Sequence, residues 1–148
     1  MPFKINLSDK KGKTWKLEVE SEDINGKELN DKIQGKEIRP DLEGYEFEIT
    51  GASDLAGFTC MKEIQGVSLS KMLLGFGKGM HKRSRKEGKK KRSNFKPDGL
   101  RIRKTVRGRV MSPAISQINM KLLKEGSKPL AEIFPEQNQP KAEAAAKK

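Results

Sequence analysis

The stretch Tyr45-Glu46-Phe47-Glu48-Ile49-Thr50 alternates large apolar side chains with polar ones at a period of two. Residues two apart on an extended strand lie on the same face, so this stretch predicts a strand with its three apolar side chains in the core. The acidic residues between them lie on the opposite face, where solvation is the ordinary explanation and acid–base catalysis is not indicated.

The same alternation occurs outward from this strand, at residues 3–8, 15–20 and 118–122. The first two runs are separated by the short polar connection 9–13, whose glycine suits a hairpin. Several short alternating strands with polar turns are typical of a mainly β domain. We therefore expect a small antiparallel sheet, closed as a β-barrel.

One short helix, over residues 27–33, is expected to interrupt these strands. Leu29 and Ile33 are spaced four residues apart, as on one face of a helix, and Gly35 follows as a stop signal. Glycines then recur too often after Ile49 for long regular elements, so turns, short strands and extended loops are predicted for residues 50–97.

The net charge of +12 is concentrated in residues 71–109, which contain 16 Lys and Arg but only two acids, Glu87 and Asp98. Residues 1–70 contain more acids than bases. Such a local excess of positive charge requires a polyanion nearby. The segment lacks the aromatic and leucine-rich face that inserts into membranes, which favours nucleic acid over an anionic membrane.

Four arginines, Arg101, Arg103, Arg107 and Arg109, stand at odd positions while the apolar residues of the same stretch stand at even positions. On a strand this places a row of guanidinium groups on one face without an acid among them. Such a row is suited to bidentate contacts with phosphates, and the alternative is a solvated outer face. Arginine-to-lysine changes there are expected to leave folding nearly unaffected.

The loop at residues 75–82 contains three glycines together with Lys78, His81 and Lys82. It does not match a nucleotide-binding phosphate loop, because no Gly-x-x-x-x-Gly-Lys-Ser/Thr pattern is present. We expect its glycines to let the backbone approach RNA closely, with Lys78, His81 and Lys82 as donors, and the alternative is a plain flexible loop. Phe76 is expected to plug the core rather than stack on a base.

The sequence thus predicts a β-barrel domain over residues 1–130, with a basic, glycine-rich extended loop, or arm, at about residues 71–99. Residues 82–97 contain almost no apolar groups and are expected to order only on their partner. Residues 131–148 are rich in Pro, Gln, Ala and Lys and are expected to form a disordered tail.

The sequence does not support a catalytic or a metal-binding site. His81 is the only histidine and Cys60 the only cysteine, so one chain cannot assemble a Cys/His zinc site. Cys60 is expected to be a small buried apolar residue. We predict no enzyme activity, no cofactor, no bound metal and no small-molecule substrate. The absence of a long apolar run further predicts a cytoplasmic protein with no membrane partner.

Several motifs resemble those of one known family: 44–54, Gly57-Phe58, Arg103-Lys104-Thr105-Val106-Arg107-Gly108 and 117–121. In this order they resemble small-subunit ribosomal protein six of the archaeal and eukaryotic type, with the likeness running from about residue 3 to residue 126. The positions that match are Gly51, Ser53, Asp54, Gly57, Phe58, Met61, Arg103, Lys104, Val106, Arg107 and Gly108.

This resemblance implies a structural constituent of the small ribosomal subunit that supports translation, with a β-barrel placed on rRNA and ribosomal proteins as neighbours. The alternative is a free-standing regulatory or chromatin-like nucleic-acid-binding protein. The residues expected to contact rRNA are Lys71, Lys78, His81, Lys82, Arg83, Arg85, Lys86, Lys89, Lys90, Lys91, Arg92, Lys96, Arg101, Arg103, Lys104, Arg107 and Arg109.

Overall fold

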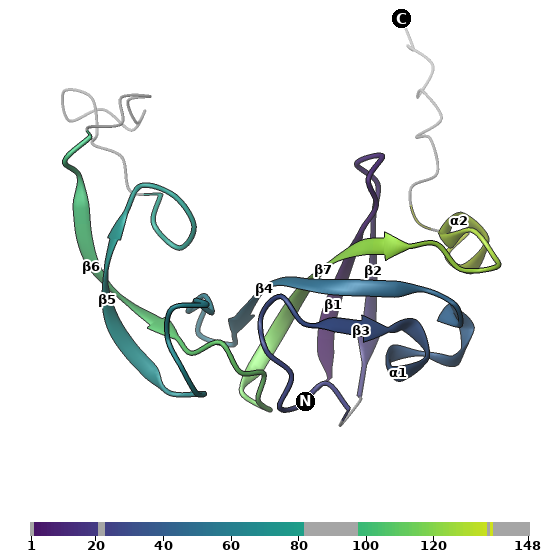
Figure 1. The fold of residues 1–148 in the computed structure, drawn as a ribbon, viewed down its shortest axis with the longest axis horizontal. Coiled ribbons are helices and arrows are strands. Elements are labelled where there is room, and N and C mark those ends of the chain that lie inside the picture. The colour runs from purple at the N-terminus through teal and green to yellow at the C-terminus, as the bar shows by residue number, and fades with distance from the viewer. Residues whose placement is uncertain (1, 21–22, 82–97, 136, 138–148) are drawn as a thin grey trace, which may run out of the picture.

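Two β-sheets lie beside each other in the computed structural model, which describes residues 2–20, 23–81, 98–135 and 137 (Figure 1). The strands are β1 (Phe3–Ser8), β2 (Thr14–Val19), β3 (Lys32–Gln34), β4 (Glu46–Asp54), β5 (Leu69–Gly75), β6 (Arg101–Arg107) and β7 (Ile115–Lys124). The helices are α1 (Gly35–Ile38), a 3-10 turn (Pro40–Leu42) and α2 (Leu130–Ile133). The larger sheet has the order β2-β1-β7-β4-β3, and β5 and β6 form a separate two-stranded ribbon.

The predicted alternation builds the core of the five-stranded sheet. Strand β4 buries Phe47 and Ile49 completely, and Tyr45 just before it is also buried. Fully burying a side chain of this size stabilises a fold by about 1.5–3 kcal/mol. Strand β1 alternates in the same way, with buried residues at Phe3, Ile5 and Leu7. The mainly β prediction is therefore confirmed.

The expected antiparallel barrel is not confirmed. Strands β1 and β7 pair in parallel, with Ile5 opposite Ile118, so the sheet is mixed. Within the described residues no strand pairing joins the edge strands β2 and β3, and the sheet is open. The edge of β2 is partly covered by the Gln137 amide, which donates to the Lys16 carbonyl and accepts from the Lys16 N–H, both at 2.7 Å.

The helix expected over residues 27–33 is wrong. Ile33 lies in strand β3 opposite Phe47, and Gly35 begins helix α1 instead of ending a helix. A β-carbon at Gly35 would lie 2.0 Å from the Leu42 carbonyl oxygen, so close packing of α1 on the following turn requires a glycine there. Leu29 is buried because its backbone pairs with the chain after β6, a contact that helical spacing cannot reveal.

The fold continues past the domain boundary expected at residue 130. Leu130 and Phe134 are 5% and 7% exposed and belong to the main core, and the Tyr45 hydroxyl donates to the Lys128 carbonyl. The first residues of the expected tail therefore pack on the sheet. Residues 136 and 138–148 of that tail lie outside the described residues.

The β5–β6 ribbon has a small core of its own. Met61, Leu74, Met80 and Val106 form a buried cluster, with Phe76 and four other apolar side chains packed against it. The inward direction of Val106 and the packing role of Phe76 agree with the sequence prediction. Only one face of the ribbon is covered in this way.

The chain that leaves β6, residues 107–111, joins the two sheets, and we call it the junction. Its Arg107 pairs in parallel with Cys60, and the Cys60 N–H in turn donates to the Ala52 carbonyl of β4 at 2.9 Å. Further along, the Met111 N–H donates to the Lys27 carbonyl at 2.8 Å. The junction is thus hydrogen-bonded to segments on both sides of the gap between the sheets.

Gly108 is the tightest point of the junction. A β-carbon there would lie 2.0 Å from the Gly66 carbonyl oxygen, which is backbone and cannot rotate away. The Gly108 N–H also donates to the Ser68 carbonyl at 3.0 Å. Only glycine allows these two backbone segments to approach so closely.

Gly108→Ala is therefore expected to destabilise the protein by about 2–3 kcal/mol or more, as overpacking against backbone does. Gly75→Ala is the matched control, because nothing lies within 4 Å of its added β-carbon, and it should change stability by less than about 0.5 kcal/mol. Urea unfolding of both variants measures the difference. Equal free energies of unfolding would contradict the packing described for the junction.

Candidate nucleic-acid interface

Three exposed cations lie on the open face of the β5–β6 ribbon. Residues directly opposite in an antiparallel pair share a face, and Lys71 is opposite Thr105, Leu73 opposite Arg103, and Gly75 opposite Arg101. Lys71, Arg101 and Arg103 are exposed, and no carboxylate among the described residues forms a salt bridge with them. This face offers unpaired positive charge to a ligand.

Arg107, in contrast, is bonded to other groups of the protein. Its Nε lies 3.1 Å from Oδ2 of Asp54, and its Nη1 donates to the Val67 carbonyl at 2.9 Å. The Arg107 side chain is only 15% exposed and that of Asp54 only 4%. The other carboxylate oxygen of Asp54 accepts the Phe58 N–H at 2.8 Å, so a single buried carboxylate holds both the turn after β4 and the end of β6.

Arg109 also has an acidic neighbour. Its Nε lies 2.9 Å from Oε2 of Glu28 in an ion pair whose geometry falls short of a hydrogen bond. The expectation of an arginine row without acids is therefore wrong, because Arg107 and Arg109 face carboxylates from distant parts of the chain. Only Arg101 and Arg103 of the row project without a described acidic partner.

The loop after β5 is tied to the rest of the protein. Gly77 and Met80 exchange backbone hydrogen bonds of 2.8 and 3.0 Å, and Lys78 Nζ donates to the Thr50 carbonyl at 3.1 Å. Lys104 Nζ donates to the Gly79 carbonyl at 3.1 Å. These contacts speak against a plain flexible loop between residues 76 and 80, and they hold two exposed ammonium groups close to glycine backbone.

A groove of about 410 Å³ lies between the turn after β4, this loop and β6. We call it the glycine groove, and its lining residues are Ala56, Gly57, Phe58, Thr59, Gly79, Arg103, Lys104 and Thr105. Gly57 has a φ of +86°, and nothing lies within 4 Å of the position of its missing β-carbon. Because Gly57 exposes its backbone beside the cations Arg103 and Lys104, a phosphate or sugar could approach the protein closely there.

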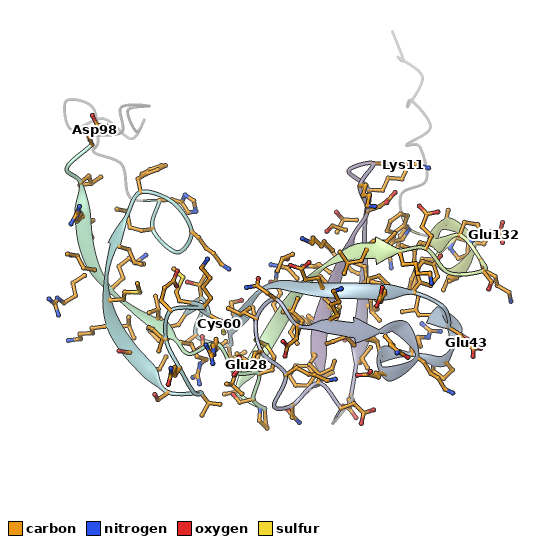
Figure 2. All side chains as sticks on the ribbon, in the orientation of Figure 1. Lys11, Glu28, Glu43, Cys60, Asp98 and Glu132 are labelled. Atoms are coloured by element: carbon orange, nitrogen blue, oxygen red, sulfur yellow. The ribbon has the colours of Figure 1, made fainter. Side chains whose placement is uncertain are left out.

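The remaining described member of the predicted set is His81, which is exposed and contacts Phe76 edge-on with ring centroids 5.7 Å apart. The chain passes from His81 to Asp98 through the rest of the basic arm, and Asp98 is labelled in Figure 2 at the end of the ribbon far from the larger sheet. The predicted residues that lie outside the described part of the chain are Lys82, Arg83, Arg85, Lys86, Lys89, Lys90, Lys91, Arg92 and Lys96.

Cys60 and Glu28 lie between the two sheets in Figure 2, beside the junction. The Cys60 thiol is fully buried, and burial raises its pKa from 9.0 to about 11, against the weaker opposing effect of Arg107. A neutral, buried thiol fits the predicted packing role. Among the described residues no group of three His, Cys, Asp or Glu side chains could hold a metal ion.

No helix in the described part of the chain is both long and apolar enough to cross a membrane.

Comparison with known proteins agrees with the motifs. The profile of the family described as ribosomal protein S6e matches residues 3–97 and 93–135. The chain belongs to this family of ribosomal proteins. The S6e match spans both sheets and helix α2, and it makes the chain a structural protein of translation and not an enzyme.

Individual relatives are archaeal S6e proteins. The chain is 39% identical over 131 residues to the small ribosomal subunit protein eS6 of Methanococcus maripaludis strain C5, covering 88% of this chain and 94% of the relative. The eS6 protein of Methanosphaera stadtmanae is 37% identical over 92% of this chain and 95% of its own length. That of Halobacterium salinarum is 33% identical over 89% and 92%.

Sequence spacing alone did not reveal Asp54 as the partner of Arg107. The two residues are 53 positions apart, and the signal that could have paired them was the S6e resemblance, which includes both. The geometry accounts for that signal, because Asp54, Gly57, Arg107 and Gly108 all belong to the connection between the sheets. Part of the family motif is therefore structural.

Arg107→Lys is expected to lower the free energy of unfolding by about 1–2 kcal/mol, because lysine lacks the planar guanidinium whose Nε and Nη1 bond Asp54 and the Val67 carbonyl separately. Arg103→Lys is the matched control on the same strand and should cost less than about 0.5 kcal/mol. Thermal or urea unfolding measures both. If Arg107→Lys were as stable as Arg103→Lys, the contacts of Arg107 would contribute nothing to folding.

The Cys60 thiol predicts a loss of stability in alkali. The unfolded chain releases the thiol proton near pH 9.0, whereas the folded protein keeps it until about pH 11, so the free energy of unfolding falls as pH rises between these values. The loss should reach about 2–3 kcal/mol. Cys60→Ala lacks this proton, so its stability deficit relative to the unaltered protein should narrow over that range. A constant deficit would contradict the burial effect.

Proposed function

We propose that this S6e protein binds small-subunit rRNA through one basic surface on the β5–β6 ribbon, as a structural part of a cytoplasmic ribosome. The surface consists of the open face of the ribbon and the adjoining glycine groove, and the basic residues among 82–97, outside the described part of the chain, are proposed as further contacts. Neighbouring ribosomal proteins are its other partners. The described members of this surface are Lys71, Lys78, His81, Arg101, Arg103 and Lys104.

The observation that carries the proposal is the contrast between two groups of arginines on one strand. Arg107 has a carboxylate and a carbonyl as partners, whereas Arg101 and Arg103 are exposed and lack a described carboxylate partner. Arg107, which stabilises the fold, is thus neutralised by a carboxylate, and no described carboxylate neutralises the exposed Arg101 and Arg103. Unneutralised arginines on a rigid strand favour a ligand with planar anionic groups, and phosphate is the anion that rRNA supplies.

The glycine groove supports the same function by shape. The open backbone at Gly57 and the residue Lys104 border one cavity, so an RNA backbone could come close to the protein backbone at Gly57. No aromatic side chain belongs to the paired residues of β5 and β6, whereas Phe58 lines the glycine groove and His81 is exposed beyond β5. The open face of the ribbon is therefore expected to rely on phosphate contacts and shape, with little reading of base identity.

Arg101→Gln combined with Arg103→Gln should weaken binding to a small-subunit rRNA fragment at least tenfold, because roughly 1 kcal/mol or more is lost per charged contact. Lys4→Gln combined with Lys32→Gln is the matched control, since it removes the same charge from exposed strand positions of the larger sheet. Filter binding or fluorescence anisotropy measures both affinities. Equal weakening by the two pairs would mean that rRNA responds only to net charge.

The salt dependence of the same affinity is a second readout. Each phosphate contact contributes close to one unit to the slope of log K against log salt, so the Arg101 and Arg103 double variant should flatten that slope by about two. The control pair should leave the slope unchanged. A slope that stays the same in the double variant would exclude phosphate neutralisation by these arginines.

A further inference from the structure

A second pocket lies on the inner face of the β5–β6 ribbon, where the side chains of Met72 and Leu74 alternate with the exposed Lys71 and Leu73 of the open face. The pocket has a volume of about 520 Å³. It lies between the ribbon and the segment before β3, both of which can be followed in Figure 1. We call it the inner pocket. One part of its lining is apolar and the other part is polar.

The apolar part of the inner pocket is formed by Met61, Met72, Leu74 and Phe76. Met61 and Leu74 are buried in the ribbon core, whereas Met72 and Phe76 are only partly buried. Thioethers and aromatic rings make favourable contacts with flat aromatic groups. Among the components of a ribosome, an unpaired RNA base is such a group, and bases that leave their helix pack on aromatic and apolar side chains.

The polar part of the inner pocket contains an amide on a fixed backbone. Asn30 lines the pocket with a φ of +72°, and it is the only described residue other than glycine with a positive φ. Its N–H donates to the Ile49 carbonyl at 2.9 Å, and the Ile49 N–H donates to the Asp31 carbonyl at 3.0 Å, so the core strand β4 holds this turn. The exposed Asn30 side chain makes no hydrogen bond with a described residue. Its amide therefore offers a donor and an acceptor, which are the groups that recognise the edge of a base.

Two lysines place the inner pocket beside the proposed rRNA surface. Lys62 and Lys78 are exposed and line the pocket, and Glu63 is the one carboxylate in its described lining. Lys78 Nζ donates to the Thr50 carbonyl, and an ammonium group has three donors, so two remain for a phosphate. The next residue, Gly79, lines the glycine groove. An RNA strand in the glycine groove therefore lies beside the loop that borders the inner pocket.

We propose that the inner pocket holds one unpaired base of small-subunit rRNA, with its ring against Met72 and Phe76 and its polar edge at the Asn30 amide. This inference rests on the proposed function, because it adds a base-binding position to the rRNA surface. The open face contacts phosphates, whereas the inner pocket selects a nucleotide that is free to leave its helix. An aliphatic side chain of a neighbouring protein is the competing occupant, and it would leave the amide and both lysines without a role.

The test uses small subunits purified from cells that carry Asn30→Gly combined with Phe76→Leu in place of the native chain. Glycine accepts the positive φ of position 30, and leucine keeps an apolar contact with the ribbon core, so the fold should be retained. Dimethyl sulfate and a carbodiimide then modify the exposed base edges of the rRNA. One base that is protected in unaltered subunits should become about tenfold more reactive, as expected when a stacked base is released.

Asn25→Gly combined with Phe134→Leu is the matched control, because neither residue lines the inner pocket, and it should leave the reactivity of that base unchanged. Asn30→Gly alone removes no atom of the ribbon core and should expose the polar edge of the same base. If every base were equally reactive in unaltered subunits and in both Asn30 variants, the inference would be overturned.

A second measurement separates this inference from the proposed function. The Asn30 and Phe76 double variant should weaken binding to the rRNA fragment about tenfold and leave the slope of log K against log salt unchanged, because no phosphate contact is lost. Arg101→Gln combined with Arg103→Gln should flatten that slope. If only the arginine pair weakened binding, the inner pocket would fail and the open face would stand. If only the Asn30 and Phe76 pair weakened binding and exposed a base, the open face would fail and the inner pocket would stand.

Discussion

The ion pair between Asp54 and Arg107 is the contact on which the arrangement of the two sheets depends. Asp54 ends a strand of the larger sheet and Arg107 ends a strand of the smaller one, and both side chains are largely buried. Breaking such a pair by removing one partner leaves a charge in a poorly solvated place, which costs more than the pair itself contributes. The backbone pairing of Cys60 with both sheets and the close approach at Gly108 reinforce the same connection.

The positive charges near the junction stabilise the fold, whereas those farther from it are proposed to bind rRNA. Arginines near the junction are neutralised by acids from β4 and from the segment before β3, while those toward the arm project without a described acidic partner. The larger sheet supplies the main hydrophobic core and a fixed base. The β5–β6 ribbon has the smaller core and lies to one side of that base (Figure 1).

Local patterns predicted the strands well because burial of alternate side chains is a local property. The runs around Phe3, Phe47 and Ile118, and the inward direction of Val106, were all read correctly from spacing. The parallel pairing of β1 with β7 could not be read in this way, because more than a hundred residues separate the two strands. Closure of the sheet into a barrel was also predicted from these local patterns and is not confirmed.

The candidate site was predictable in its charge and not in its partners. Clustering of Lys and Arg in one third of the chain predicted a basic arm and an arginine-rich strand, yet alternation treated Arg103 and Arg107 as equivalent. They differ because Asp54, brought in by the turn after β4, reaches only Arg107. The helix predicted from the spacing of Leu29 and Ile33 is wrong, because the backbone at Leu29 pairs with the junction and Ile33 pairs with β4.

Native-state hydrogen exchange tests most directly whether the junction unites the two sheets. The amides of Met61 and Arg107 bond across the junction, to the carbonyls of Arg107 and Thr59, each at 3.0 Å. If the connection forms one cooperative unit with the larger sheet, both amides should exchange with the same free energy of opening as the core amides of β7. Exchange of these two amides at a free energy several kcal/mol below that of β7 would show that the ribbon opens on its own, and would contradict the account.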